Sequence, residues 1–325
     1  MIPNKLKKGD EIRIISPARS MSILSKDLLD IAITRFKELG FKITFSKHVK
    51  EIDEFNSSSI ESRIADLHEA FLDKNVKAIL TTIGGFNSNQ LLKYIDYQII
   101  KKNPKILCGF SDITALQNTI YAKTGLVTYS GVHFSSFGMK KGFDYSLEYF
   151  KKCLMENNEF EVIPSQEWSD DSWYKDQEKR KFIKNEGHWI LNEGKAEGAI
   201  IGGNLCTFNL LQGTEFMPSL KNCILFIEDD DVTNKLEFDR NLQSIIHLPD
   251  FNGVKGIVIG RFQKKSEITR EIITKIIKTK KELDNLPVIA NANFGHTTPI
   301  FTFPVGGKAT LVANKKETSL RIIEH

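Results

Sequence analysis

The stretch KILCGFSDITALQNTIYAK, residues 105–123, passes directly from a short apolar run into a segment with the spacing of a helix. Residues Lys105–Phe110 predict a buried strand, and residues Asp112–Lys123 predict the helix that follows it. A strand that enters a helix through a tight turn is the repeating step of a parallel sheet covered by helices. This stretch therefore indicates an α/β fold.

The same alternation extends outward from this stretch across the first half of the chain. Short β-branched runs recur at regular intervals, and segments with apolar residues on one helical face separate them. We expect them to form a largely parallel sheet of the Rossmann-like or flavodoxin-like kind. The other expected strands are Glu11–Pro17, Phe41–Lys47, Val76–Ile83 and Leu126–Ser130, and the other expected helices are Ser25–Leu39, Ser59–Asp73, Ser88–Lys101 and Tyr145–Glu156.

The composition and the periodicity of the sequence change after residue 158. Gln166–Lys184 is rich in charge and has neither the period of a strand nor that of a helix, so we expect a long loop there. The predicted organisation is an N-terminal α/β domain over 1–158, an aromatic linker over 159–195 and a C-terminal β-rich, barrel-like or swivelling α/β domain over 196–325. In the last part we expect strands at Ala199–Gly203, Cys223–Asp229, Val254–Arg261 and Val288–Asn291, helices at Leu205–Leu211, Lys235–His247 and Glu267–Leu283, and a strand-like tail at Phe301–Ile323.

Length and composition limit the possible classes of function. A chain of 325 residues, 41% of them hydrophobic, is long enough for two packed cores, because single cores stop growing at about 250–300 residues. Its 45 Lys and Arg residues against 41 Asp and Glu residues leave a net charge of +4, without the basic stripe that binding to a nucleic-acid polymer requires. The polar N-terminus and the lack of an apolar run of about 18 residues predict a cytoplasmic protein with no membrane partner.

Ser111 stands at the turn between the expected strand and helix of the stretch 105–123. A serine in such a turn can present its hydroxyl as a nucleophile, while the backbone N–H groups that follow it stabilise an oxyanion. The alternative is that Ser111 is only the N-cap of the helix. On this stretch alone the cap is the favoured interpretation, because Ser and Asp are preferred caps and the G-x-S-x-G pattern is absent.

Gly84 and Gly85 form a second candidate, again between an expected strand and a helix. Paired glycines allow the backbone to approach a ligand closely. They are equally consistent with a tight turn, and the G-x-G-x-x-G spacing of a dinucleotide site is absent.

Two further candidates follow strands of the second half. His296 lies in a turn-rich segment that would present its ring as a base, or it makes only a structural hydrogen bond. Glu228 is the first of four consecutive acids and could orient a histidine, but the run could also be a solvated loop or a site for a hard cation. Structural hydrogen bonds are the expected role of the histidines His68, His133, His188 and His247.

Taken together and in this order, these segments resemble the LD-carboxypeptidase family of serine peptidases, and the resemblance covers nearly the whole chain. The stretch 166–189, which contains three tryptophans, together with Gly202–Leu205 resembles the branch of microcin C immunity proteins within that family. The matching segments are Ile14–Pro17, Gly84–Phe86, Gly109–Asp112, Gly202–Leu205, Ile227–Asp229 and Asn293–His296.

The resemblance implies a role for each candidate. Ser111 would be the nucleophile, His296 the general base and Glu228 the acid that orients the base. The backbone N–H groups of Gly85 and Asp112 would form the oxyanion hole, and neither a metal ion nor an organic cofactor would be needed. The residues expected to contact the substrate are Asn204, Trp168, Trp173 and Trp189.

The resemblance also implies a function. We expect a homodimeric serine carboxypeptidase that takes a small peptide or an aminoacyl nucleotide and cleaves the amide between the aminoacyl group and the nucleotide, which would give immunity to microcin C-like compounds. One alternative is a muramoyltetrapeptide LD-carboxypeptidase of cell-wall recycling, which uses the same triad. An alternative of another class is a protein that binds an aminoacyl nucleotide without turnover.

Overall fold

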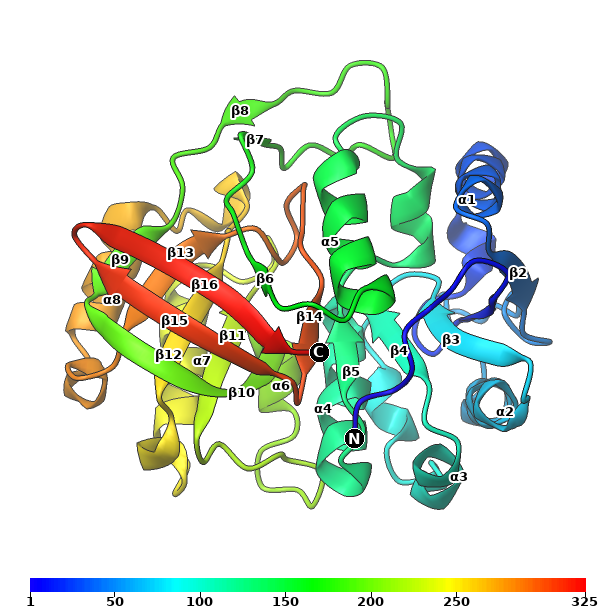
Figure 1. The fold of residues 1–325 in the computed structure, drawn as a ribbon, viewed down its shortest axis with the longest axis horizontal. Helices are drawn as coiled ribbons and strands as arrows, with labels where there is room; N and C mark the ends of the chain where they lie inside the picture. Colours follow the sequence, from blue (N-terminus) through cyan, green and yellow to red (C-terminus); the bar gives the residue numbers. More distant parts are fainter.

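The computed structural model describes the backbone of residues 1–325 and the side chains of all of them except Glu317. The chain forms two large sheets that lie side by side, with helices packed around them (Figure 1). Sheet A has the strand order β14-β5-β4-β3-β1-β2, in which the ladders that join β2, β1, β3, β4 and β5 are parallel. The predicted α/β class is thus confirmed, and of the two expected kinds of parallel sheet the strand order is the flavodoxin-like one. Its strands are β1 (Glu11–Ile15), β2 (Lys42–Phe45), β3 (Val76–Thr81), β4 (Ile106–Gly109), β5 (Thr128–Ser130) and β14 (Phe303–Val305).

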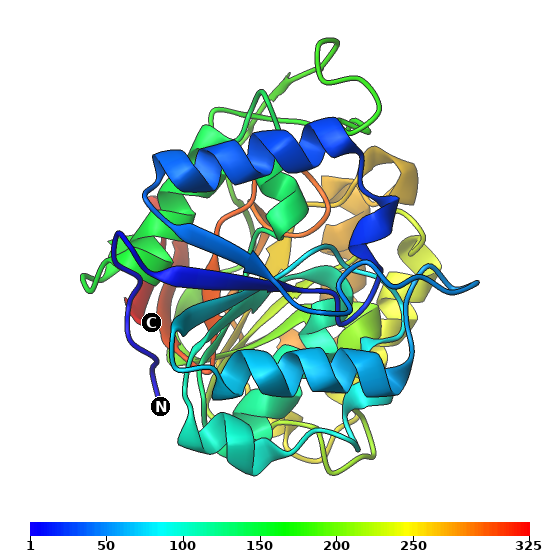
Figure 2. The same ribbon diagram turned by 90° about the vertical axis from the view of Figure 1, so that its right-hand side faces the viewer.

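Helices cover both faces of sheet A. Figure 2 shows α1 and α2 on opposite sides of the strands. Helix α1 buries Leu28, Ala32 and Phe36, which recur every four residues and therefore share one face. Its N-terminus is capped by Ser25, whose hydroxyl accepts a hydrogen bond from the Leu28 backbone N–H. The helices of this half are α1 (Lys26–Glu38), α2 (Ile60–Leu72), α3 (Tyr97–Lys102), α4 (Thr114–Thr124) and α5 (Asp144–Met155).

One predicted helix is divided in the structure. The segment predicted as a single helix over Ser88–Lys101 is a 3-10 turn, η2 (Ser88–Leu91), followed by α3. The Asp96 carboxylate accepts hydrogen bonds from the backbone N–H groups of Gln98 and Ile99, so a new helix begins there. Apolar spacing alone did not reveal this internal cap.

Sheet B is the β-rich sheet predicted for the second half. Its order is β6-β16-β15-β10-β11-β12-β13-β9, and the ladders from β10 to β13 are parallel. The carboxyl ends of β11 and β13 therefore lie at one edge of the sheet. Its strands are β6 (Phe160–Glu161), β9 (Trp189–Asn192), β10 (Gly194–Asn204), β11 (Cys223–Glu228), β12 (Gly256–Gly260), β13 (Val288–Ala292), β15 (Lys308–Asn314) and β16 (Glu317–Glu324), and its helices are α6 (Leu205–Asn209), α7 (Lys235–Ile246) and α8 (Arg270–Lys278).

The connection between the halves is more structured than its sequence suggested. Strand β6 pairs with β16 and β9 pairs with β13, so both ends of the predicted linker join sheet B. Between them, β7 (Glu167–Trp168) and β8 (Ile183–Lys184) pair only with each other. Strands of two to four residues are too short to give a periodic signal in the sequence, and β6 and β9 are in addition held by partners far away along the chain. The domain boundaries at 158 and 196 stay a prediction.

The C-terminal segment ties the two sheets together. After β13 the chain returns to sheet A as β14, which pairs antiparallel with β5, before it enters β15 of sheet B. The segment between β13 and β14 contains His296 and passes close to sheet A. Among the described residues, no helix is both long and apolar enough to span a membrane.

Candidate active site

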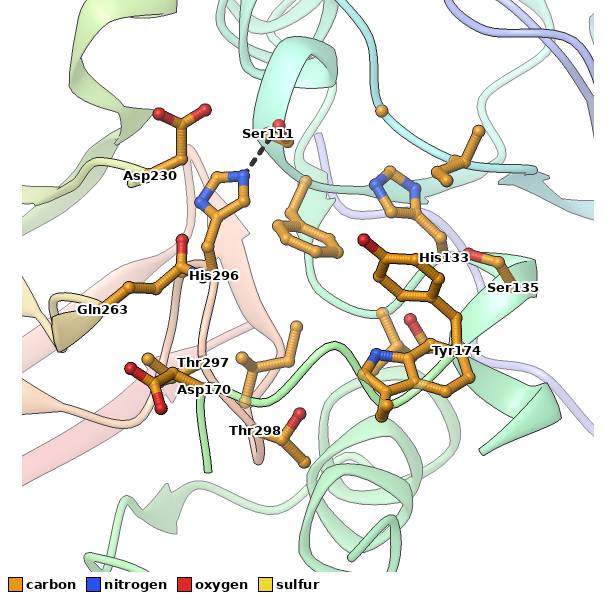
Figure 3. Close-up of a pocket in the computed structure, with 18 of the residues that line it drawn as sticks. Ser111, His133, Ser135, Asp170, Tyr174, Asp230, Gln263, His296, Thr297 and Thr298 are labelled. Carbon is orange, nitrogen blue, oxygen red and sulfur yellow. Dashed lines mark hydrogen bonds between the residues drawn. The ribbon is translucent and has the colours of Figure 1, made fainter. Parts of the chain in front are cut away.

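Ser111 occupies a strained turn at the carboxyl end of β4. Its φ angle is +62°, a left-handed conformation that is uncommon for a residue with a side chain. The 3-10 turn η3 (Ser111–Ile113) and α4 follow, but the N-cap of η3 is Phe110 and no side chain caps either element. The Ser111 hydroxyl lies instead 3.0 Å from His296 Nε2 (Figure 3). The capping interpretation of Ser111 is therefore wrong.

Glu228 and His296 reach this serine from sheet B. Glu228 is the last residue of β11 and is only 2% exposed, and its Oε2 lies 2.8 Å from His296 Nδ1. The carboxylate therefore faces one ring nitrogen of His296 while the serine hydroxyl faces the other. The structure thus brings together three residues predicted from the sequence, one from sheet A and two from sheet B.

Gly295 makes the contact between Glu228 and His296 possible. Its φ angle is +103°, and a Cβ atom on it would lie 2.5 Å from Glu228 Oε2. No side chain fits there without displacing the carboxylate, and only glycine adopts this backbone conformation at low cost. The glycine that precedes His296 is therefore required by the packing of Glu228.

The acids around His296 control its protonation. Burial by itself lowers the pKa of His296, but the Glu228 carboxylate, aided by Asp230 and Asp229, outweighs burial and raises this pKa to about 9. Figure 3 shows Asp230 on the same side of the cavity as the imidazole. Burial and the neighbouring Glu228 charge also raise the pKa of Asp229, to about 7. The imidazolium form of His296 is thus strongly stabilised.

The predicted oxyanion hole joins two segments that Asp112 holds together. The Asp112 carboxylate accepts hydrogen bonds from the backbone N–H groups of Asn87, at 3.1 Å, and Ser88, at 2.9 Å. A Cβ atom on Gly84 would lie 3.1 Å from Ser111 Oγ, so the glycine turn lies directly against the serine. Among the described residues, no acceptor is found for the N–H of Gly85. Gly85 itself lines the cavity in front of Ser111.

A cavity of about 440 Å³ opens in front of Ser111. Trp173 and Tyr174, from the long connection, line it together with His296. Trp168 and Trp189 line a neighbouring cavity of about 270 Å³ instead, where the Trp168 ring lies 5.2 Å from the Arg261 guanidinium. The three tryptophans predicted to contact one substrate therefore divide between two cavities.

The prediction that Asn204 lies in the substrate pocket is corrected by the structure. Asn204 is 2% exposed and does not line the cavity. Its amide donates to Asp229 at 3.2 Å, its side-chain oxygen caps α6, and its backbone N–H donates to Thr114 Oγ1. Since Asn204 pairs with Glu228 across the β10–β11 ladder, it links the start of α4 to the Glu228 strand from beneath the site.

His133 is a cavity residue that the sequence analysis assigned to a structural role. It follows β5, the strand beside β4, and Figure 3 places it across the cavity from His296. Its Nδ1 lies 2.7 Å from Thr81 Oγ1, while its Nε2 has no hydrogen-bond partner among the described residues. Burial and the nearby His296 lower its pKa to about 3, so the ring is neutral. Its place after a strand of the same parallel edge was a usable signal.

No group of three or more His, Cys, Asp or Glu side chains in the part of the chain that the structure describes is arranged to hold a metal ion. Two of the acids that follow β11 bind protein groups. Asp231 pairs with Lys265 at 3.0 Å, and Asp230 accepts a hydrogen bond from the Val232 backbone N–H. The expectation that no cofactor is needed stays a prediction.

Comparison with known proteins gives matches over both halves of the chain. Residues 12–131 match the LD-carboxypeptidase N-terminal domain, and residues 197–311 match the LD-carboxypeptidase C-terminal domain. YocD of Bacillus subtilis (strain 168), provisionally named a carboxypeptidase, is 58% identical, and the alignment covers 100% of both chains. The microcin C7 self-immunity protein MccF of Escherichia coli is 32% identical over 97% of this chain and 94% of its own length.

Solved structures give the same result. The crystal structure of an MccF-like protein from Bacillus anthracis has a TM-score of 0.99 and 61% identity, with 100% of both chains covered. A structure of the microcin C7 self-immunity protein MccF in complex with aspartyl sulfamoyl adenosine has a TM-score of 0.90 and 30% identity, covering 100% of this chain and 99% of that one.

Proposed function

Because this chain belongs to the LD-carboxypeptidase family and is a serine-type carboxypeptidase, we propose that it cleaves the amide bond of aminoacyl nucleotides and so detoxifies microcin C-like compounds. The observation that carries the proposal is the hydrogen-bonded chain from Glu228 through His296 to Ser111, which opens into a cavity lined by an aromatic pair from the long connection.

The proposed mechanism begins with proton transfer from Ser111 to His296. The imidazole Nε2 takes the hydroxyl proton as Ser111 Oγ attacks the carbonyl carbon of the scissile amide. Glu228 holds the other ring nitrogen and stabilises the imidazolium that forms. His296 then returns the proton to the leaving nitrogen, the amide C–N bond breaks, and water hydrolyses the acyl-enzyme by the same route.

The negative charge that develops on the carbonyl oxygen would be held by the N–H groups of Gly85 and Asp112. One such donor contributes about 2.7–4 kcal/mol to transition-state stabilisation in comparable hydrolases. The bonds from Asn87 and Ser88 to the Asp112 carboxylate keep the two donor segments together, so little reorganisation is needed when the charge forms.

The proposed substrate class follows from the aromatic side of the cavity. Trp173 and Tyr174 stand in the same cavity as Ser111, and flat aromatic rings stack on nucleobases in a sequence-tolerant way. A volume of about 440 Å³ accommodates a ligand of that size. The complex of the related immunity protein with aspartyl sulfamoyl adenosine supports the same class. The homodimer and the cytoplasmic location stay part of this proposal.

Mass spectrometry of two incubations tests the proposal. The purified protein is incubated with an aminoacyl-sulfamoyl adenosine and, separately, with an L,D-linked muramyl tetrapeptide. We expect release of the amino acid from the adenosine compound. Cleavage of the tetrapeptide alone would assign the protein to cell-wall recycling, and tight binding of the adenosine compound without product would support a protein that only sequesters it.

We expect kcat/KM to rise with pH until His296 loses its proton. His296 acts as a base only in its neutral form, and its pKa is raised to about 9, so the neutral fraction grows about tenfold per pH unit below that value. Glu228→Gln removes the charge that raises this pKa. The rising limb of a pH–rate profile between about pH 6 and pH 10 should therefore move to lower pH in this variant, with a lower plateau. An unmoved limb would show that another group controls the rate.

We expect Trp173→Ala to weaken cleavage of nucleotide substrates selectively. Loss of one stacked base costs about 1–3 kcal/mol, which raises KM for the aminoacyl-sulfamoyl adenosine by about 5- to 150-fold. Trp168→Ala is the matched control, because Trp168 belongs to the same connection but faces the neighbouring cavity. An equal loss in both variants, or an equal loss on simple peptides, would indicate that Trp173 only supports the fold.

A further inference from the structure

The acidic residues that line the main cavity have hydrogen-bonding or ion-pair partners, whereas the one arginine there has no ion pair among the described residues. Arg19 is the one Lys or Arg among the described lining residues, which also include four aspartates. Two of these acids, Asp171 and Asp231, are paired with basic residues beside the cavity, and the other two, Asp170 and Asp230, accept hydrogen bonds from backbone N–H groups. Asp171 binds Arg180 at 2.9 Å, and Asp231 binds Lys265 at 3.0 Å. For Arg19, by contrast, no ion pair is found among the described residues. Its guanidinium is therefore a cation of the cavity that is left for a ligand.

The backbone of Arg19 is held against the predicted oxyanion hole. Its N–H donates to the Gly84 carbonyl at 3.3 Å, and its own carbonyl accepts a hydrogen bond from Thr82 Oγ1. A Cβ atom on Gly85 would lie 3.1 Å from the Arg19 nitrogen and 3.3 Å from its Cγ. Arg19 thus packs directly on the two glycines, and the first of these contacts Ser111.

The ring of Phe86 supports the guanidinium. The centre of the Arg19 guanidinium lies 5.1 Å from the centroid of this ring, a cation–π distance, although Phe86 is 70% exposed. This aromatic side chain beside the cavity provides a face on which the guanidinium stacks. The arrangement limits the loss of side-chain freedom when the guanidinium binds an anion.

The topology of sheet A places this pair where a ligand is expected. Strand order reverses between β1 and β3, and ligands of open α/β sheets bind outside the carboxyl ends of the strands at this point. Arg19 follows β1, and the Gly84–Phe86 turn follows β3. The unpaired guanidinium therefore stands at the switch point of the sheet, next to the nucleophile that follows β4.

We propose that Arg19 binds the anionic group that the substrate carries beside its scissile amide. This inference rests on the proposed function. A peptide cleaved by a carboxypeptidase has its terminal carboxylate one carbon away from the scissile nitrogen, and an aminoacyl nucleotide has phosphoryl or sulfamoyl oxygens at that nitrogen. The carboxylate and the phosphoryl group are oxyanions, and the acyl-sulfamoyl group becomes an anion when it loses its acidic N–H, with the charge shared between that nitrogen and the adjoining oxygens. A guanidinium can bind each of these groups through parallel N–H donors. The inferred substrate class is an amide with such an anionic group at or next to the leaving nitrogen.

The test compares two pairs of substrates that differ in that group. One pair is an L,D-linked tetrapeptide and its C-terminal amide. The other is an aminoacyl-sulfamoyl adenosine and the corresponding 5′-aminoacylamino-5′-deoxyadenosine, which keeps the amide and the nucleoside but lacks the sulfamoyl oxygens. Kinetics are measured for the unmodified protein, Arg19→Gln, Arg19→Lys and Arg240→Gln, the last being an exposed arginine on α7 whose loss changes net charge equally.

We expect Arg19→Gln to lower kcat/KM for the charged member of a pair by about 10- to 100-fold, mainly through KM, and to leave the neutral member within about threefold. Arg19→Lys should retain part of the preference, and Arg240→Gln all of it. The pair that responds identifies the anion as a carboxylate or as a sulfamoyl or phosphoryl group. An equal loss on both members of each pair, or no loss on either, overturns the proposal.

Binding measurements separate this inference from the proposed function. If the unmodified protein cleaves none of these compounds, the proposed function fails, and calorimetric titrations of Ser111→Ala and Ser111→Ala/Arg19→Gln decide about Arg19. A preference for the charged member that disappears with Arg19→Gln supports the anion site. Equal affinity for both members, or no binding of the charged ones, overturns it.

Discussion

Replacing Ser111 with alanine is expected to reduce kcat by about 10⁴-fold or more while leaving the fold intact. Among the described residues, the Ser111 hydroxyl is the hydrogen-bond partner of His296 Nε2, which lies 3.0 Å away and would take its proton during attack on the carbonyl. Loss of a serine nucleophile in comparable hydrolases leaves only the contribution of the oxyanion hole and of binding. Product release is measured in single-turnover and steady-state assays with the substrate identified by mass spectrometry, and substantial residual turnover would remove Ser111 from the mechanism.

Ser111→Gly provides the matched control for this prediction. The φ angle of +62° is uncommon for serine and equally so for alanine, but it is easily adopted by glycine. We therefore expect both variants to be inactive, the alanine variant to unfold like the unmodified protein, and the glycine variant to be more stable by about 1 kcal/mol. Chemical denaturation measures these differences. A destabilised alanine variant would mean that the hydroxyl also supports the fold.

Gly295→Ala is expected to reduce kcat/KM by at least about 100-fold and the free energy of unfolding by about 1–3 kcal/mol. The new methyl group would lie 2.5 Å from Glu228 Oε2, at a backbone φ of +103°. Either the carboxylate or the His296 segment must move, and both movements break the 2.8 Å contact that orients the imidazole. Steady-state kinetics and urea denaturation on the same preparation measure the two effects.

The control for Gly295→Ala is Gly213→Ala. Gly213 also has a positive φ, of +73°, but no atom lies within 4 Å of a Cβ atom placed on it. The control variant should therefore lose stability through backbone strain alone and keep its activity. If Gly295→Ala were equally active, the close packing of Glu228 against this glycine would have no part in catalysis.

The predictable part of the fold came from local patterns. Alternating apolar runs and helical spacing predicted the strands of sheet A and most helices around it. Each strand or helix of a covered parallel sheet has its own apolar residues in a recognisable pattern, so the pattern can be detected within one short segment. The strands of the connection, β6 to β9, were missed because each has only two to four residues, and β6 and β9 are held by distant partners. The helix predicted over residues 88–101 is divided for a different, local reason, because the Asp96 side chain caps a new helix there.

The candidate site was predictable where its residues follow strands. Ser111, Glu228 and His296 each lie at or shortly after the carboxyl end of a parallel strand, so their meeting could be expected from the motifs. Asn204 has the same kind of position, yet its side chain turns inward to Asp229 and the start of α6. Motif position therefore identifies which strand end a residue occupies, whereas side-chain direction depends on the neighbouring strands.

The α/β class, the family and the three residues of the hydrogen-bonded chain could be deduced from the amino-acid sequence, because each of these depends on residues close together in the chain or on short motifs in order. The folded structure was needed to show that Trp173 shares the cavity of the serine while Trp168 and Trp189 do not, that His133 faces that cavity, and that Arg19 has no ion pair among the described residues beside the glycine turn. These facts depend on how loops from different strands meet at the edges of two sheets. Such contacts are set by packing between residues far apart in sequence, which no local pattern encodes.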